Sequence, residues 1–381
     1  MNSESRNANN SVQDSAIKFK KRSPVAAALL TLLVPGLGHY YCGEVKRGFF
    51  LFLIYLVYST TFFALIKFIP GYAIALYTLL TCIPIGTYIL IESIIIAIKN
   101  TKYKLQSFNK AKYYVAIIVT SIYYVSPITD IFSPGIFTTA TGSMLNTVLP
   151  GDRFFDNDLY YGIKNPFTGK YAILYNKPQA GDIVNFIYPG LPEEAPPKET
   201  TNYFKRILAV PGDSFVINNR IIKLNDKYCF YEHFYFDEKF AFLGKEPNPS
   251  IFPKGSGWNV DNYGPIKVPK AGDKVSFDTS SISLWKRIIR DEGNKLEIIK
   301  DRIFINDIEK YSYIFKDNYY FMIGDNWYNS LDSRYFGFVN ENDIDSKITM
   351  IYFSWDRDIP LKDTGRKLRS IRWDRIGKMI E

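Results

Sequence analysis

The sequence predicts two parts of different fold class, N-terminal transmembrane α-helices followed by a mainly antiparallel β domain. Long apolar runs before residue 132 indicate the helices, because a helix that crosses a hydrocarbon core of ~30 Å needs about 20 apolar residues. Short runs of alternating polarity after residue 133, separated by Pro-Gly-Asp and Asn-Asp turns, indicate the strands. With 381 residues, of which 47% are hydrophobic, the chain is long enough to build a packed core in the second part.

The first part divides into a tail and a membrane region. Residues 1–22 are polar and end in the basic run KFKKR, which is typical of a disordered cytoplasmic tail. Residues 23–132 form the predicted membrane region. It contains two runs of full spanning length, 48–69 and 71–98, and a weaker third run, 113–132, which a proline and an aspartate interrupt. These three runs are predicted to span the membrane as helices.

Basic residues predict the orientation of this region. Lysine and arginine cluster at 18–22, 46–47 and 99–112, and cytoplasmic loops carry an excess of these residues. If all three clusters are cytoplasmic, the apolar segment 23–43 is re-entrant and bends at its central Pro-Gly pair. The long runs then cross three times and place the second part on the non-cytoplasmic face of the cytoplasmic (inner) membrane. Four crossings would leave it inside, so the number of spans is part of the prediction.

Residues 133–357 are predicted to form the β domain. Runs such as DIVNFIY and SFVINNRIIKLN alternate in polarity and are bounded by turn residues. An aromatic-rich stretch, 228–263, is predicted to be an insertion, and its role is left unassigned. For the basic segment 358–381, two structures stay open: a segment that lies on the membrane, or a solvated terminal helix.

Composition excludes several kinds of site. The net charge is +9, but the basic residues are spread along the chain without a nucleic-acid motif, so an anionic membrane surface explains them better than nucleic acid. No His, Glu and Cys spacing supplies three metal ligands, and no Gly-rich phosphate loop occurs. There are two histidines, so a Ser-His-Asp triad would depend on His233, because His39 lies in an apolar segment. No elbow motif or suitable neighbour supports His233. A serine hydrolase here would therefore need another base, and lysine is the remaining common choice. No cofactor is expected.

Three stretches resemble a known family. TGSMLNTVLPGD (141–152), YFKRILAVPGD (203–213) and FMIGDNWYNSLDSRYFGFV (321–339) are similar to the signature boxes of bacterial type I signal peptidases. The family consists of membrane-anchored Ser-Lys proteases with a β-rich catalytic domain. The resemblance implies a serine endopeptidase that removes N-terminal signal peptides from exported preproteins after small residues. Preproteins and membrane lipid are the expected partners, and the oligomeric state stays open.

The first two boxes contain the residues implied to act in catalysis. Ser143 matches the family nucleophile and Lys205 its general base. Thr141 is implied to stabilise the oxyanion together with the Ser143 N–H. Met144 offers a hydrophobic floor for a small substrate side chain. A lysine pKa of ~10.4 must fall by ~2–3 units for the amine to act as a base near neutral pH, and burial beside aromatic residues can lower it that far.

The third box contains the residues implied to support the dyad. Ser330 is implied to hydrogen-bond and orient the lysine. Asp332 and Arg334 are implied to form a supporting pair, and their i, i+2 spacing places them on one face if the segment is extended. The strand before them ends in a tight turn made by three residues: Gly324, Asp325 and Asn326.

One position departs from the family pattern. The nucleophile box usually reads Ser-Met-x-Pro-Thr, and here Asn146 occupies the proline position. Proline would fix φ and stiffen the backbone after the nucleophile, whereas asparagine loosens it and permits a turn that its side chain stabilises. The departure leaves the geometry of the substrate groove open, more than the presence of catalysis.

Two other functions stay open at this level. A penicillin-binding-type acyl-transferase uses Ser-x-x-Lys, which occurs at 283–286 and also at 15–18 and 107–110, without the companion motifs. A non-catalytic membrane scaffold of the same fold is the other. An internal echo, FKRIL against WKRII, sets Lys286 in surroundings similar to those of Lys205, and repeated hairpin units explain it.

Overall fold

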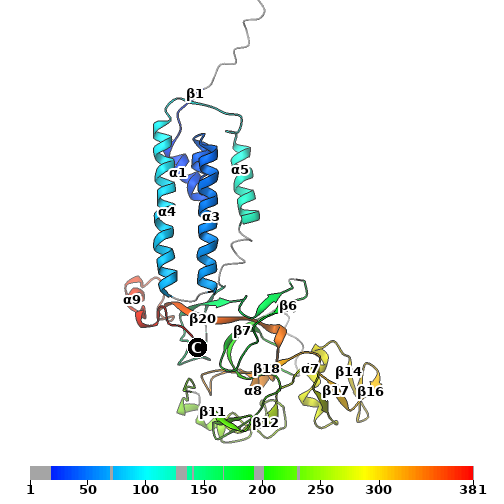
Figure 1. Cartoon of the computed structure of the whole chain (residues 1–381). Helices are drawn as coiled ribbons and strands as arrows, with labels where there is room; N and C mark the ends of the chain where they lie inside the picture. The colour runs from blue at the N-terminus through cyan, green and yellow to red at the C-terminus, as the bar shows by residue number, and fades with distance from the viewer. Residues whose placement is uncertain are drawn as a thin grey trace, which may run out of the picture. The chain divides into compact units, whose positions relative to one another are not determined.

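The computed structural model describes residues 19–68, 72–125, 135–139, 141–165, 167–192, 201–229 and 232–380. Most of the predicted tail lies outside the described residues, as does the end of the third apolar run with Pro127 and Asp130. The chain separates into two compact units, Met1–Pro134 and Gly135–Glu381 (Figure 1).

The first unit is helical. Its elements are β1 (Phe19–Lys20), α1 (Pro24–Leu33), α2 (Leu37–Tyr41), α3 (Val45–Phe68), α4 (Tyr72–Lys99), β2 (Tyr103–Lys104), α5 (Ala111–Thr120) and the π-helical turn η1 (Ser121–Val125). Ser23 caps the start of α1, where its side chain accepts a hydrogen bond from the Ala26 N–H. The Pro35-Gly36 pair separates α1 from α2, because Gly36 has φ +88°, which is not a right-handed helical conformation.

One segment of this unit has the character of a membrane span. Within the described residues, Val45–Phe62 in α3 is long and apolar enough to cross a bilayer, and only 6% of it is buried inside the protein. The helix Pro24–Leu33 and the segment Ala111–Tyr123 are apolar but shorter. The second long run is helical, as α4. Spanning by three helices stays a prediction.

The second unit is built on a seven-stranded sheet whose order is β19-β18-β8-β7-β20-β4-β3. All neighbouring strands in it are antiparallel, which confirms the predicted mainly antiparallel β domain. The strands are β3 (Gly135–Thr138), β4 (Asp152–Asn157), β7 (Ile183–Ile187), β8 (Asn202–Ala209), β18 (Tyr319–Ile323), β19 (Val339–Asn340) and β20 (Ile344–Ser354). β3 lies at one edge.

Smaller sheets and short helices complete the unit. One sheet has four strands: β9 (Ser214–Asn218), β10 (Ile221–Leu224), β11 (Lys227–Cys229) and β12 (Tyr263–Lys267). Another has three: β14 (Leu296–Ile299), β15 (Arg302–Ile305) and β16 (Ile308–Glu309). The strand pairs are β5 (Gly162–Lys164) with β6 (Tyr171–Leu174), and β13 (Lys274–Ser276) with β17 (Ser312–Ile314). The helices are η2 (Glu238–Gly244), η3 (Ile282–Leu284), α7 (Lys286–Asp291), α8 (Ser333–Phe336), η4 (Glu341–Asp343), α9 (Thr364–Arg369) and η5 (Trp373–Arg375).

Repeated hairpins follow both copies of the internal echo. The triplets β9-β10-β11 and β14-β15-β16 both pair in sequence order. Each second hairpin turns at an Asn-Asp pair in which both residues have positive φ, as a two-residue type I′ turn requires. The hairpins therefore repeat, but the segments before them do not. Lys205 lies in the strand β8, whereas Lys286 begins the helix α7, so the expectation of similar surroundings for the two lysines is wrong.

The aromatic stretch 228–263 packs within the second unit. The rings of Phe234 and Phe236 lie 5.0 and 5.3 Å from the ring of Trp327. The backbone N–H of Tyr235 donates to the Asp325 carbonyl over 2.7 Å, and the Trp327 N–H donates to the Tyr235 carbonyl over 3.0 Å. The stretch thus braces the third sequence box.

The basic C-terminal segment is not a single solvated helix. α9 is short, and the chain then returns along β20, where the Ile351 N–H donates to the Lys378 carbonyl over 2.9 Å. Arg375 holds this return: its Nη2 donates to Asp152 Oδ2 over 2.6 Å, and the Asp152 side chain is fully buried. A buried charge pair and the buried Ile380 side chain favour this path over a solvated helix.

Candidate active site

Ser143 lies in the turn between β3 and β4, and the third sequence box fixes the backbone of this turn. The Asn326 N–H donates to the Ser143 carbonyl over 3.0 Å, and Asn326 Nδ2 donates to the Gly142 carbonyl over 2.9 Å. Gly324 makes the close approach possible, because a Cβ there would lie 2.7 Å from the Ser143 carbonyl oxygen and 2.1 Å from Ser330 Oγ. Any larger residue at 324 would displace the turn that carries Ser143.

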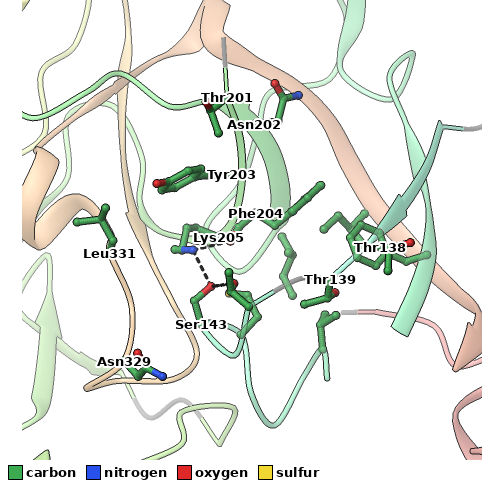
Figure 2. Close-up of a pocket in the computed structure, with 16 residues that line it drawn as sticks. Thr138, Thr139, Ser143, Thr201, Asn202, Tyr203, Phe204, Lys205, Asn329 and Leu331 are labelled. Carbon is green, nitrogen blue, oxygen red and sulfur yellow. Dashed lines mark hydrogen bonds between the residues drawn. The ribbon is translucent and has the colours of Figure 1, made fainter. Parts of the chain in front are cut away.

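Lys205 comes from β8, where its backbone pairs with Val184 of β7. The lysine is only 4% exposed. Its Nζ donates to Ser143 Oγ over 2.9 Å and to the Phe204 carbonyl over 3.0 Å (Figure 2). When the amine is neutral, the first contact also allows the serine hydroxyl to donate to the nitrogen.

The surroundings of Lys205 favour its neutral form. Burial is the main cause and lowers the pKa of Lys205 to about 8, against the opposing effect of the Asp332 and Asp325 carboxylates. Each carboxylate also faces an arginine, so its negative charge is already paired. The amine can therefore lose its proton near neutral pH.

Two buried arginine–aspartate pairs flank the dyad. Arg206 donates from Nε to Asp325 Oδ1 and from Nη2 to Asp325 Oδ2, both over 2.9 Å. Arg334 donates from Nε to Asp332 Oδ1 over 2.9 Å and from Nη2 to Asp332 Oδ2 over 2.8 Å. Such bidentate contacts fix both position and orientation. Only the second pair was predicted, and Asp332 caps α8 rather than extending a strand.

The hydroxyls predicted to assist the dyad differ in their contacts. Thr141 Oγ1 lies 3.3 Å from Ser143 Oγ, beside the nucleophile as expected. Ser330 is buried, but its Oγ has no hydrogen-bond partner among the described residues. The predicted bond from Ser330 to Lys205 is therefore not made in this structure. The Lys205 amine is directed instead at Ser143 and the Phe204 carbonyl.

Asn146 ties the nucleophile turn to the aromatic stretch. Its φ is +85°, a conformation closed to proline, whose ring holds φ near −65°. Its Nδ2 donates to the His233 carbonyl over 3.2 Å. The side chain thus stabilises the turn through a contact that proline could not make, as the sequence suggests for asparagine.

A cavity of about 440 Å³ opens at the dyad. Its apolar side is formed by five side chains: Met144, Val148, Phe154, Ile183 and Ile348. Met144 is 2% exposed and belongs to this floor, as predicted from its place after the serine. Figure 2 shows Thr138 and Thr139 on one side of the Ser143–Lys205 pair, and Asn329 and Leu331 on the other.

The other sequence candidates lie elsewhere. Lys286 lines a different cavity together with Ser283, so the Ser-x-x-Lys motif at 283–286 does not share the site of Ser143. His39 Nε2 lies 3.2 Å from a carboxylate oxygen of Glu92 in the helical unit. Among the described residues, no group of three His, Cys, Asp or Glu could hold a metal ion.

Sequence reasoning missed several supporting contacts. One of them is the ion pair between Arg206 and Asp325. Its signal in the sequence is the position of Arg206 directly after Lys205, because a second positive charge beside a buried base needs an acidic partner. The two tethers from Asn326 to the nucleophile turn had no local signal, because their ends lie 183 and 184 residues apart.

A buried lysine amine in contact with a serine hydroxyl, on a mainly antiparallel β sheet and beside an apolar cavity, is the arrangement of a serine hydrolase with a lysine base. The chain belongs to the family "Signal peptidase, peptidase S26", whose sequence model matches residues 110–254 and 309–355.

Curated relatives agree with this membership. The signal peptidase I of Buchnera aphidicola from Schizaphis graminum is 31% identical over 297 residues, which cover 74% of this chain and 85% of that protein. The signal peptidase I of Helicobacter pylori strain J99 is 26% identical and covers 64% of this chain and 85% of its own length. The signal peptidase I of Pseudomonas aeruginosa is 27% identical, and the match covers 58% of this chain and 64% of that protein.

Proposed function

We propose that this chain is a membrane-bound serine endopeptidase that removes N-terminal signal peptides from exported preproteins. The contact of 2.9 Å between Lys205 Nζ and Ser143 Oγ supports the proposal most directly, because the amine is buried beside an apolar cavity. Membership of the signal peptidase family and the names of its relatives point to the same activity.

Catalysis starts with attack of Ser143 Oγ on the carbonyl carbon of the scissile peptide. Neutral Lys205 accepts the hydroxyl proton as the Oγ–C bond forms. The Ser143 N–H and the Thr141 hydroxyl stabilise the oxyanion of the tetrahedral intermediate. Protonated Lys205 then gives its proton to the leaving amine, the C–N bond breaks, and an acyl-enzyme remains. Water, deprotonated by Lys205, hydrolyses the ester and restores the serine.

The third box positions this machinery rather than reacting. Asn326 holds the carbonyls of the nucleophile turn, and Gly324 leaves room for it. Two ion pairs hold the loop after β18 that contains Gly324 and Asn326. They join Arg206 to Asp325 and Arg334 to Asp332. Ser330 is buried beside Gly324 and supports the dyad through packing.

Specificity for small residues is proposed from the floor of the cavity. Met144, Phe154 and Ile183 are each at most 2% exposed and leave an apolar recess at the nucleophile. A short apolar side chain fills such a recess without strain, whereas a charged one would lose its hydration. The residue before the cleavage site is therefore small.

The membrane arrangement is proposed from the sequence and the helical unit. Three helices span the cytoplasmic membrane, the segment 23–43 is re-entrant, and residues 133–357 with the C-terminal segment lie on the non-cytoplasmic face. The span-like segment of α3 and the clusters of basic residues support this arrangement. Anchoring in the bilayer brings the peptidase to substrates whose signal segments are themselves apolar.

Cleavage of a purified preprotein by the detergent-solubilised full chain tests the function. We expect Ser143→Ala and Lys205→Ala to lower kcat/KM by at least about 10³-fold, because each removes a partner in proton transfer. Lys274→Ala, an exposed lysine on β13, is the matched control and should keep wild-type activity. Full cleavage by either dyad variant would rule out the proposed mechanism.

A further inference from the structure

A second cavity adjoins the catalytic cavity, and the proposed mechanism does not use it. Its volume is about 250 Å³. Six of its lining residues matter here: Ser250, Phe252, Ser283, Lys286, Leu331 and Tyr335. Leu331 also lines the catalytic cavity, so this one side chain contributes to the walls of both. The Leu331 side chain is 39% exposed, so it lies at the surface between the two cavities and not in the core.

The position of Leu331 indicates which part of a substrate reaches this second cavity. Figure 2 shows Leu331 on one side of the Ser143–Lys205 pair, with Thr138 and Thr139 on the other. β3 ends at Thr138 and is the edge strand of the sheet, so an extended peptide can pair along it. The apolar floor suits the small residue before the scissile bond. If the residues before the scissile bond pair along β3, those after it leave toward Leu331, on the opposite side of the dyad.

The chemistry of the second cavity differs from that of the first. Lys286 contributes an amine, and none of the described residues that line the cavity with it is acidic. Ser250, Ser283 and Tyr335 add hydroxyl groups, and Phe252 gives an apolar base that is 5% exposed. A wall that carries the Lys286 amine and three hydroxyls favours a carboxylate ligand.

We propose that this cavity binds the first residues of the mature protein after the cleavage site, and that it selects for an acidic side chain there. The proposal rests on the proposed function, because it requires a peptide bound across Ser143. Leu331 lines the catalytic cavity itself, and an extended chain advances about 3.3 Å per residue, so the first few residues beyond the cleaved bond can pass Leu331. Lys286 would then be a specificity-determining residue.

The test uses three peptides that share a signal-peptide cleavage site and carry Glu, Gln or Lys at the third residue after it. With the full-length wild-type enzyme in detergent, we expect the Glu peptide to have a kcat/KM about three- to fivefold above that of the Gln peptide. The Lys peptide should fall below the Gln peptide by a similar factor. The difference should lie in KM and shrink at high salt, because a charge pair away from the reacting atoms changes binding.

Lys286→Glu should reverse this order, and Lys286→Gln should abolish it. Both variants should keep the wild-type kcat on the Gln peptide, which shows that they fold. Lys274→Glu makes the same charge change on an exposed strand and should leave the order of the three peptides unchanged. The subsite is overturned if Lys286→Glu ranks the peptides as the wild type does, or if Lys274→Glu reverses them equally.

Failure of the subsite and failure of the proposed function give different results. If the wild type cleaves all three peptides with equal kcat/KM and Ser143→Ala cleaves none, the subsite is wrong and the peptidase assignment stands. If Ser143→Ala cleaves as the wild type does, or the wild type cleaves no peptide, the proposed function fails, and the subsite fails with it.

Discussion

At Lys205, burial lowers the pKa of the amine and nearby carboxylates raise it, and the effect of burial is larger. The side chain is almost fully covered, while the two nearest carboxylates are already paired with Arg206 and Arg334. An unpaired carboxylate at the same place would hold the lysine protonated and unable to accept a proton. The two arginines therefore help to keep the Lys205 amine neutral.

At Asn146, the backbone conformation leads to a prediction that opposes the family pattern. Asn146→Pro should lower kcat/KM by more than about tenfold, because proline cannot adopt the φ of +85° and the turn that carries Ser143 must shift. Asn146→Gly should stay within about threefold of the wild type, since glycine accepts that φ and only the contact to His233 is lost. Preprotein cleavage by the two variants measures both effects.

The contrast between the two variants is informative in either direction. Full activity of Asn146→Pro would mean that the turn takes the usual family conformation during catalysis. Equal loss in both variants would instead place the importance in the asparagine side chain.

Residue roles could be predicted from the sequence where a motif carries them, and not where a contact depends on the fold. Ser143, Lys205 and Thr141 are marked by short motifs, and the structure brings their side chains together. The contact expected of Ser330 is not made, because its position depends on how the loop after β18 packs on Gly324. The pairing of Arg206 with Asp325 joins two boxes that lie far apart along the chain.

At the scale of elements, local turn chemistry could be predicted and strand order could not. Asn-Asp pairs mark the hairpin turns of β10 with β11 and of β15 with β16, as alternating polarity and turn residues predict. The long-range pairings of β20 with β4 and of β8 with β18 bring Lys205, Ser143 and the third box to one place. Such pairings have no local sequence signature.

Two segments show what composition alone does not predict about packing. The stretch 228–263 is rich in aromatic residues because its rings pack on Trp327 and Tyr263, within the core of the second unit. The basic C-terminal segment contains Arg375, whose partner Asp152 is buried. In both cases a residue type that suggests a surface or an insertion is used inside the fold.

At the scale of the whole molecule, the proposed orientation can be tested by protease accessibility. In sealed right-side-out vesicles, added protease should digest residues 135–381 and leave a membrane-protected fragment of the first unit. In inverted vesicles the same residues should be protected, because three crossings from a cytoplasmic N-terminus end outside. Digestion of the second unit only in inverted vesicles would contradict the three-span arrangement.

The sequence predicts more about the membrane part than the described structure tests. Long apolar runs and basic clusters are signals that need no tertiary contacts, so three spans and a re-entrant segment are predictions that the sequence makes without the fold. Within the described residues, one segment of α3 meets the length and hydropathy of a span. The remaining crossings depend on the vesicle experiment.

The dependence of kcat/KM on pH tests the central claim, that buried Lys205 is the base for Ser143. The pKa of Lys205 is lowered to about 8, so the amine is neutral above this pH and protonated below it. With a peptide that has no titrating group, kcat/KM of the wild type should level off above pH 8 and fall about tenfold per unit below it. A profile that is flat from pH 6 to 9, or one that rises only near the pKa of an exposed lysine at about 10.4, would contradict the account.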